Sequence, residues 1–235
     1  MIVSIHQPNY IPWLGLYYKM FHSDVFVYLD DAQYSNVGDH NVNKIKTSQG
    51  EYKLKIPVEQ HLGDRILDVR TKDELGWKEK HLKTITMNYS KAPFFDCFFP
   101  QLSEVIKNHE GNISDLNIKI DRLIMDGFGF ATKIVKSSEL DIHTAREERV
   151  IDICVALGAS EYISGNGARA YEVEEHFTQR GIKLTYTDYK PIEYNQIWPK
   201  IGFLPYMSAI DYIFNCGFDW NYVEEQVRII NIGNR

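Results

Sequence analysis

A short segment near the amino terminus, residues 6–13, gathers polar and aromatic side chains around two prolines. Because each proline ring fixes φ at about −65°, the turn holds its neighbours in set directions, and they lose little entropy on binding. The imidazole of His6 has an ordinary pKa near neutrality and can serve as a general acid or base. The alternative is a structural turn whose histidine is bound by backbone atoms. We predict a catalytic role for His6 and substrate contacts for its neighbours Gln7, Asn9, Tyr10 and Trp13.

An acidic pair follows the next apolar run of the chain. Asp30 and Asp31 come directly after residues 25–29, which are rich in β-branched and aromatic side chains. Two adjacent carboxylates can orient an amine or hydroxyl, or hold a divalent cation through oxygen ligands. A helix cap or a solvated turn is the structural alternative. We predict Asp30 and Asp31 as catalytic residues that orient a nucleophile, Gln33 as a substrate contact, and no resident metal.

A third segment, residues 162–169, places small residues between a predicted strand and a predicted helix. Ser164 and Gly165 would let a phosphate or carboxylate approach backbone amides, and Arg169 could hold that anion. An ordinary turn with a glycine hinge would give the same pattern. Other polar residues are predicted to face the same substrate, and these are Asn41, Lys44, Tyr194, Gln196 and Asn215.

The elements that must position these residues follow an α/β rhythm. Short apolar runs alternate with helical stretches of roughly 12 residues, which is typical of a parallel sheet with helices on its faces. The predicted strands are residues 2–5, 25–29, 132–137, 161–164 and 183–187, and the predicted helices between them are residues 14–22, 144–157 and 168–180. The sequence therefore predicts a Rossmann-like, mostly parallel sheet, in which ligands bind beyond the carboxyl ends of the strands. We expect the amino-terminal loop and the acidic pair to open onto a common cavity there.

The middle and the end of the chain are predicted to be helical. Residues 77–89, 93–109 and 113–127 read as helices, and residues 208–216 and 220–230 as two more at the carboxyl end. Residues 52–58 alternate in polarity like a half-exposed strand, with which residues 66–69 are expected to pair. We predict one α/β domain over residues 1–235, with residues 77–130 as a helical insertion or subdomain within it.

Composition narrows the class of protein. The net charge of −6 argues against a protein that coats nucleic acid or anionic membrane. Three cysteines without a Cys-x-x-Cys pair, together with no signal peptide and no apolar run of about 18 residues, predict a cytoplasmic protein without a membrane span. The sequence has no P-loop, no Gly-x-Gly-x-x-Gly and no zinc-ligand spacing, so it identifies no cofactor.

Several motifs, taken in order, resemble the WbqC-like protein family. They are residues 5–15 (Ile-His-Gln-Pro-Asn-Tyr-Ile-Pro-Trp-Leu-Gly), 24–34 (Asp-Val-Phe-Val-Tyr-Leu-Asp-Asp-Ala-Gln-Tyr) and 78–93, and the resemblance continues at residues 157–165, 188–189, 194–196 and 208–217. It covers nearly the full length, and its first motif is long and specific. One departure lies at Asn43, which an arginine usually follows in the family and Lys44 follows here. A lysine cannot make the bidentate anion contact of an arginine.

The resemblance implies an enzyme of O-antigen, lipopolysaccharide or other surface-polysaccharide biosynthesis, for which a glycine transferase role has been proposed. The implied reaction moves a small acyl or aminoacyl group onto an amino sugar or a sugar hydroxyl. Its partners would be a sugar nucleotide and an acyl or aminoacyl donor. Three alternatives stay open: a metal-dependent glycosyltransferase with the acidic pair on the metal, an ATP-dependent amide ligase of nucleotidyltransferase-like fold, and a non-catalytic sugar-binding protein. The paired histidines of such ligases are missing, because Pro12-Trp13-Leu14-Gly15 stands in their place.

Overall fold

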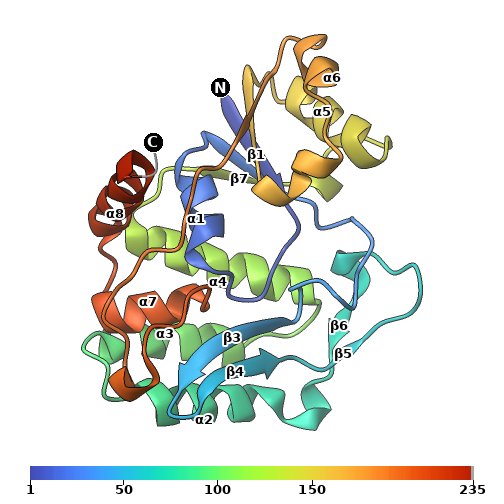
Figure 1. Cartoon of the computed structure of the whole chain (residues 1–235). Helices are drawn as coiled ribbons and strands as arrows, with labels where there is room; N and C mark the ends of the chain where they lie inside the picture. The colour runs from blue at the N-terminus through green and yellow to red at the C-terminus, as the bar shows by residue number, and fades with distance from the viewer. Residues whose placement is uncertain (234–235) are drawn as a thin grey trace. The chain divides into compact units, whose positions relative to one another are not determined.

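The computed structural model describes residues 1–233, which form two compact units (Figure 1). Unit 1 comprises residues 1–7, 15–32 and 130–189. Unit 2 comprises residues 8–14, 33–129 and the chain from Lys190 onward. Both units are therefore assembled from separate stretches of sequence, and each is described by itself below.

Unit 1 is built on a parallel sheet of five strands, which confirms the predicted α/β class. The strand order is β7-β2-β1-β8-β9, and every neighbouring pair is parallel. The strands are β1 (Ile2–His6), β2 (Val25–Tyr28), β7 (Lys133–Lys136), β8 (Glu161–Ser164) and β9 (Lys183–Tyr186). All four residues of β2 are buried, as expected for a strand covered on both faces.

The helices of unit 1 cover this sheet and supply its core. They are α1 (Leu14–Phe21), α5 (Arg146–Ala156) and α6 (Glu174–Thr178), with two 3₁₀ turns, η3 (Ser137–Glu139) and η4 (Asn166–Ala170). The core joins strand residues such as Val3 and Val27 to Ile153 of α5 and Phe177. The ring of Phe177 stacks on Tyr162 with centroids 5.5 Å apart.

One predicted helix of unit 1 is much shorter than the sequence pattern indicates. Residues 168–180 were expected to form a single helix, whereas the structure has η4, a break, and then α6. At the break Glu172 accepts a hydrogen bond from the Ser164 hydroxyl at 2.8 Å, and the flanking Val173 is extended. The inward-facing carboxylate of Glu172 thus lies at the point where the helix is interrupted.

The order in which strands are added to the sheet reverses next to β1. From β1 it adds β2 and β7 on one side, then returns to place β8 and β9 on the other. The pairing of β1 with β8 stops at Ser4, which faces Ile163, while the pairing with β2 continues to His6. The two strands that flank the reversal thus part at their carboxyl ends, which is where open α/β sheets bind ligands.

Unit 2 combines an antiparallel hairpin with a layer of helices. The hairpin pairs β3 (Val42–Thr47) with β4 (Gly50–Lys55), and a smaller ladder pairs β5 (Val58–Glu59) with β6 (Arg70–Thr71). The helices are α2 (Trp77–Tyr89), α3 (Phe95–Lys107), α4 (Ile113–Phe128), α7 (Ala209–Cys216) and α8 (Trp220–Gly233), with 3₁₀ turns η1 (Ile66–Asp68), η2 (Asp73–Leu75) and η5 (Pro199–Ile201). The predicted helical stretch of residues 77–130 is thus packed in one unit with the hairpin and the carboxyl-terminal helices.

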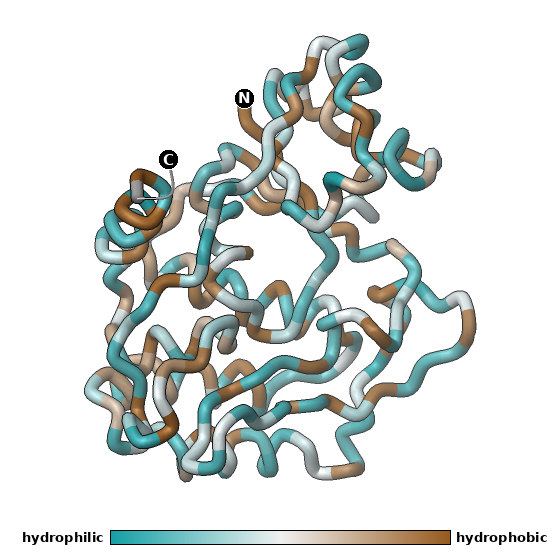
Figure 2. Tube along the Cα trace, viewed as in Figure 1, coloured by the Kyte–Doolittle hydropathy of each residue, from teal (hydrophilic) through white to brown (hydrophobic). Residues whose placement is uncertain are grey.

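Local signals set the ends of the central helix of unit 2. The side chain of Asn112 caps α4 by accepting from the Asp115 backbone N–H at 2.8 Å, and Gly129 ends the helix with a φ of +73°. The helix α8 carries both hydrophobic and hydrophilic residues along its length (Figure 2). Within residues 1–233, no helix has the length and apolar character needed to cross a bilayer.

A close approach between α4 and Phe218 leads to a first prediction. A Cβ added at Gly127 would lie 2.3 Å from a carbon of the Phe218 ring. Helix propensity alone favours alanine over glycine by about 1 kcal/mol, but overpacking costs about 1–3 kcal/mol. We expect Gly127→Ala to lower the free energy of unfolding in urea. Adding Phe218→Leu should make the loss smaller than the sum of the two single changes. A stability gain in Gly127→Ala would contradict the contact.

Candidate functional site

A cavity of about 350 Å³ opens in unit 1 at the carboxyl ends of β1 and β8. It lies where these strands part, so its position matches the general rule for ligand sites in open α/β sheets. Its polar lining comes from the end of β1, from α1, and from the turn that follows β8. The polar side chains concerned are His6, Gln7, Lys19, Ser164, Tyr171 and Glu172.

The cavity contains a backbone carbonyl that has lost its strand partner. The His6 carbonyl accepts from the Leu29 N–H at 2.8 Å, on the side of β2. Successive carbonyls of a strand point to opposite sides, so the Ile5 carbonyl points toward β8, beyond the last paired residue of β1. The Lys19 ammonium donates to it at 2.9 Å. A side chain thus replaces the strand bond that is missing there.

His6 is half-buried and has a defined tautomer when neutral. Its Nδ1 lies 2.8 Å from the Gln7 carbonyl oxygen, which can only accept a hydrogen bond. The Nδ1 atom therefore carries the proton, and the lone pair of the neutral ring is on Nε2. This is the arrangement in which a histidine can take a proton from a bound substrate.

Lys19 is a buried amine in the wall of the cavity. It is 3% exposed, and burial lowers the pKa of its ammonium to about 7, while the negative charge of Glu172 partly opposes that shift. The residue lies in the last turn of α1, where the helix carbonyls favour a cation. The Lys19 amine therefore loses its proton at a lower pH than a lysine in water does.

Glu172 and Ser164 form the acidic side of the same cavity. Burial raises the pKa of the Glu172 carboxyl, and the hydrogen bond from Ser164 and the charge of Lys19 lower it by less. Ser164 is 1% exposed and donates its hydroxyl proton to this carboxylate. A carboxylate at this place repels a phosphate, so the cavity suits an amine or a hydroxyl better than a strong anion.

The turn after β8 leaves open space around its glycines. A Cβ added at Gly165 or Gly167 would meet no protein atom within 4 Å. Arg169, which was predicted to hold an anion, is exposed. Its Nε donates a hydrogen bond to the Asn166 side-chain oxygen at 3.1 Å, and its guanidinium lies 4.0 Å from the centre of the Tyr186 ring. Ser164 and Gly165 line the cavity, whereas the guanidinium of Arg169 is held by these neighbours.

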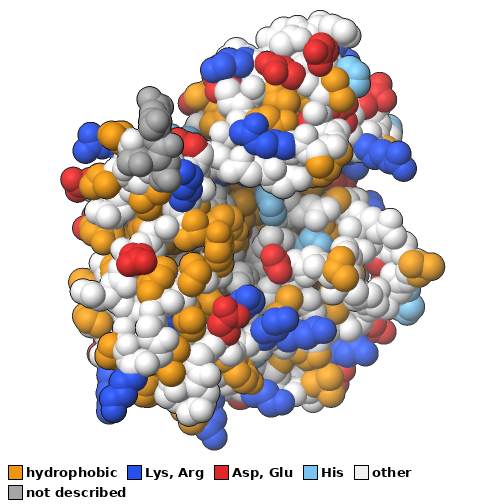
Figure 3. Space-filling view, in the orientation of Figure 1, with side chains coloured by type: hydrophobic (Ala, Val, Ile, Leu, Met, Phe, Trp, Pro, Cys, Tyr) orange, Lys and Arg blue, Asp and Glu red, His pale blue; other side chains and the backbone are white. Residues whose placement is uncertain are grey.

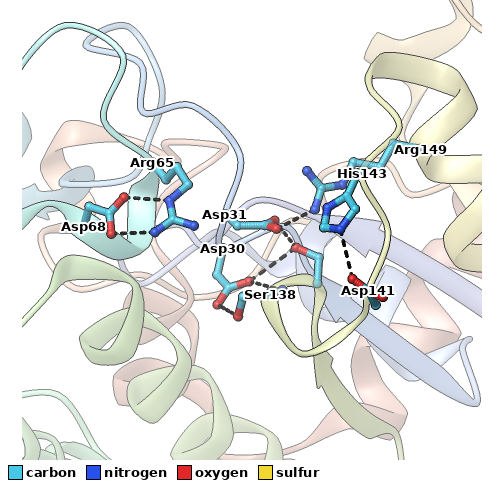
Figure 4. Close-up of polar contacts among 9 residues, drawn as sticks. Asp30, Asp31, Arg65, Asp68, Ser138, Asp141, His143 and Arg149 are labelled. Atoms are coloured by element: carbon cyan, nitrogen blue, oxygen red, sulfur yellow. Dashed lines mark hydrogen bonds and ion pairs between the residues drawn. The ribbon is translucent and has the colours of Figure 1, made fainter.

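Asp30 and Asp31 are engaged by a neighbouring loop of unit 1 (Figure 4). Asp30 is 2% exposed and accepts from the Ser138 backbone at 3.0 Å and from the Ser138 hydroxyl at 2.6 Å. Asp31 accepts from Ser137 and forms an ion pair with Arg149. The pair thus ties the end of β2 to the segment after β7, and neither carboxylate lines the cavity described above. Within residues 1–233, no cluster of three or more His, Cys, Asp or Glu side chains could hold a metal.

The predicted loop continues into unit 2, where a second cavity of about 540 Å³ is found. Asn9 and Trp13 line this cavity together with Lys44, as does the exposed ring of Tyr206. Basic side chains, coloured blue, gather on the surface over the β3–β4 hairpin in Figure 3. The segment of residues 6–13 therefore supplies His6 and Gln7 to unit 1, and Asn9 and Trp13 to unit 2.

Other predicted substrate contacts of unit 2 have protein partners. Tyr10 is fully buried with its hydroxyl 3.0 Å from Nδ1 of His81, and burial raises its pKa. Asn41 is 4% exposed and donates to the Ile56 carbonyl at 2.8 Å. Gln33 is exposed and forms an isolated antiparallel bridge with Arg65, which in turn pairs with the neighbouring Asp68 (Figure 4). Tyr10 and Asn41 thus hold unit 2 together.

A buried carboxylate accounts for the last group of predicted residues. Asp211 in α7 is fully buried and accepts from the hydroxyls of Tyr89 at 2.6 Å and Tyr194 at 2.8 Å, and from the Gln196 amide at 2.8 Å. Asn215 accepts from the Ile197 N–H at 2.8 Å. Tyr194, Gln196 and Asn215 therefore anchor an irregular segment of the chain to α7.

Sequence reasoning missed the two charged residues of the unit 1 cavity. Lys19 is the one charged residue in the apolar run Leu-Gly-Leu-Tyr-Tyr-Lys-Met-Phe. A lone charge in a helix that is otherwise apolar indicates a functional site, because lysine is rarely buried without a reason. Glu172 has no such signal, because its inward position depends on the helix break. Lys53, Lys55 and Tyr206 of the unit 2 cavity were also missed, because only the strand pairing brings these two lysines to the predicted Lys44.

The lowered pKa of Lys19 makes stability depend on pH. The unfolded chain binds this proton with a pKa of about 10.5 and the folded chain with one of about 7. Between these values the unfolded state binds more protons, so the free energy of unfolding rises with pH. Relative to Lys19→Met, we expect the wild type to gain about 2 kcal/mol between pH 7 and pH 9 in urea denaturation. Parallel pH curves for the two proteins would exclude a buried, easily deprotonated amine.

Comparison with known proteins places the chain in a family. The model of the WbqC-like protein family matches residues 7–221. The uncharacterized protein Rv1507c of Mycobacterium tuberculosis is 32% identical over 223 residues, which cover 92% of this chain and 94% of that protein. No solved structure matched the chain. The family match spans both units and nearly all the residues discussed above, so this chain belongs to the WbqC-like protein family.

Proposed function

We propose that the protein is a transferase that moves a small acyl or aminoacyl group, glycyl in the favoured case, onto an amine or hydroxyl of a nucleotide-activated sugar. The product would serve O-antigen or other surface-polysaccharide biosynthesis. The observation that carries the proposal is the unit 1 cavity, which brings His6 and the buried amine of Lys19 together at the reversal point of the sheet. Membership in the WbqC-like family supports it.

The chemistry assigns a task to each of these groups. The acceptor nitrogen attacks the carbonyl carbon of the donor, and His6 takes the proton that this nitrogen loses through its Nε2 lone pair. A C–N bond forms, and the carbonyl oxygen becomes an oxyanion. The protonated amine of Lys19 stabilises this charge, since an oriented cation in a partly buried site is worth more than one in water. The donor bond then breaks, and His6 returns the proton to the leaving group.

Glu172 suits the binding of the acceptor. Its carboxylate can accept a hydrogen bond from the attacking amine or hydroxyl, which is the orienting task that the sequence assigned to Asp30 and Asp31. These two aspartates already bind Ser138 and Arg149. Their engagement also counts against the glycosyltransferase alternative, in which the same oxygens would have to bind a metal ion.

The base assignment is tested with glycyl donors and nucleotide-activated amino sugars. Turnover is followed by mass spectrometry as the addition of one glycyl residue to the sugar. We expect His6→Asn to lower kcat by about 100-fold or more, the usual contribution of general acid–base catalysis. His143→Asn is the matched control, because that imidazole is 88% exposed and pairs only with the surface residue Asp141. Full turnover in His6→Asn would overturn the role given to this residue.

The cavity itself is tested by filling it. Gly165 has a φ of −80° and open space where a Cβ would lie, so valine fits its backbone and meets no protein atom within contact distance at that carbon. We expect Gly165→Val to change the free energy of unfolding by less than about 0.5 kcal/mol, as surface substitutions do. Its kcat/KM should fall by about ten-fold or more, because lost proximity alone can cost 100-fold. Unchanged kcat/KM would place the reaction elsewhere.

A further inference from the structure

The unit 2 cavity is lined by three lysines, which lie on one face of the β3–β4 hairpin. The antiparallel register sets Lys44 opposite Lys53 and Val42 opposite Lys55. Paired residues project from the same face, and so do residues two apart along a strand. Lys44, Lys53 and Lys55 therefore share one face, and all three line the cavity. Like charges directly opposite each other weaken strand pairing, so the arrangement is unfavourable for the hairpin alone.

These lysines are only partly neutralised by the protein. Lys44 forms an ion pair with Glu51 at 2.8 Å. For Lys53 and Lys55, no carboxylate partner is found among the residues that the structure describes. Asp39 is the acidic member of the cavity lining. The cavity is therefore a cationic site with one carboxylate, which suits a ligand that carries both anionic groups and hydroxyls.

An aromatic pair forms another part of the cavity wall. The rings of Trp13 and Tyr206 lie 5.3 Å apart at an angle of 56°. Tyr206 is 56% exposed, although it is a large aromatic residue. Its backbone has a φ of +59°, a conformation that is unfavourable for a bulky residue. Residues in such conformations are concentrated at ligand and active sites, and they persist where the surrounding structure holds them.

We infer that this cavity binds the nucleoside diphosphate part of a nucleotide-activated sugar. The lysines bind the two phosphates, and Trp13 and Tyr206 offer flat faces to the base or the ribose. A volume of about 540 Å³ is far larger than one phosphate and lies within the range of small-molecule sites, about 300–1,000 Å³. The inference rests on the proposed function only in its choice of a sugar nucleotide as the ligand.

Comparison with the unit 1 cavity supports the assignment of the phosphates to the unit 2 cavity. Its polar lining includes Glu172, whose charge opposes a phosphate, and the predicted phosphate contact Arg169 is held by Asn166 and Tyr186. The unit 1 cavity thus has one lysine and one glutamate, whereas the unit 2 cavity has three lysines and one aspartate. The sugar nucleotide's phosphates are therefore assigned to Lys44, Lys53 and Lys55, and not to the turn after β8.

Isothermal titration calorimetry on the full chain tests the inference directly. The probes are the diphosphates of uridine, thymidine, guanosine, cytidine and adenosine, with inorganic pyrophosphate as a comparison. We expect at least one nucleoside diphosphate to bind about ten-fold more tightly than pyrophosphate, because the base adds stacking contacts with the aromatic rings. Equal affinity for pyrophosphate, or no heat from any nucleotide at about 1 mM, the upper end of usual substrate affinities, would overturn the inference.

Matched variants assign the binding to this cavity. Lys53→Gln/Lys55→Gln should weaken nucleotide binding by about ten-fold or more, since two charged hydrogen bonds to the phosphates are lost. Lys83→Gln/Lys91→Gln changes the net charge equally at exposed sites outside the cavity, and should change the affinity by less than about two-fold, because salt screens distant charges. Equal losses in both double variants would show that bulk charge, and not this site, attracts the nucleotide.

The aromatic wall has its own test. Tyr206→Gly removes the ring at a position where φ favours glycine, so the fold should be kept or slightly stabilised. We expect this variant to weaken nucleotide binding by about five-fold or more while pyrophosphate binding stays unchanged, as loss of base stacking implies. Unchanged nucleotide affinity would remove Tyr206 from the site. Because these are binding experiments, they can succeed even if glycyl transfer fails, and the two proposals are separable.

Discussion

The early end of the pairing between β1 and β8 is the constraint on which the unit 1 site depends. Beyond Ser4 the Ile5 carbonyl has no strand partner, and a buried carbonyl must find a donor. Lys19 supplies that donor from α1, and the burial that this requires lowers the pKa of its amine. The open cavity and the lowered pKa of the Lys19 amine therefore have one origin.

The segment of residues 8–13 owes its shape to unit 2 as well as to its prolines. The Asn43 amide donates to the carbonyls of Tyr10 and Ile11 at 3.1 and 2.7 Å, and Nδ1 of His40 lies 3.0 Å from the Pro8 carbonyl. These contacts satisfy backbone groups that no regular element would satisfy. The family motif thus combines two kinds of residue, those that line a cavity and those that hold the turn.

Periodicity in the sequence was enough to predict the parallel sheet and helices such as α2, because burial sets those patterns directly. It failed between η4 and α6, where the helix is broken and Glu172 accepts a hydrogen bond from Ser164 of another element. For the site, residue type led to His6 and Trp13, which line cavities, but also to Tyr194, which binds a buried carboxylate. A polar side chain looks the same in sequence whether its partner is a substrate or Asp211. Only the three-dimensional pairing separates the two cases. The same pairing is needed to bring Lys53 and Lys55 to the predicted Lys44.

The interleaving of the two units bears on how the chain can be made. In unit 1, β2 pairs with β7 only after residues 33–129 have been synthesised, and β8 and β9 emerge later still. Unit 2 in turn waits for α7 and α8 at the end of the chain. Contacts between residues so distant in sequence slow folding, and surfaces left uncovered meanwhile favour aggregation. No cut at a single point separates the units, so a ribosome must release nearly the whole polypeptide before either can close.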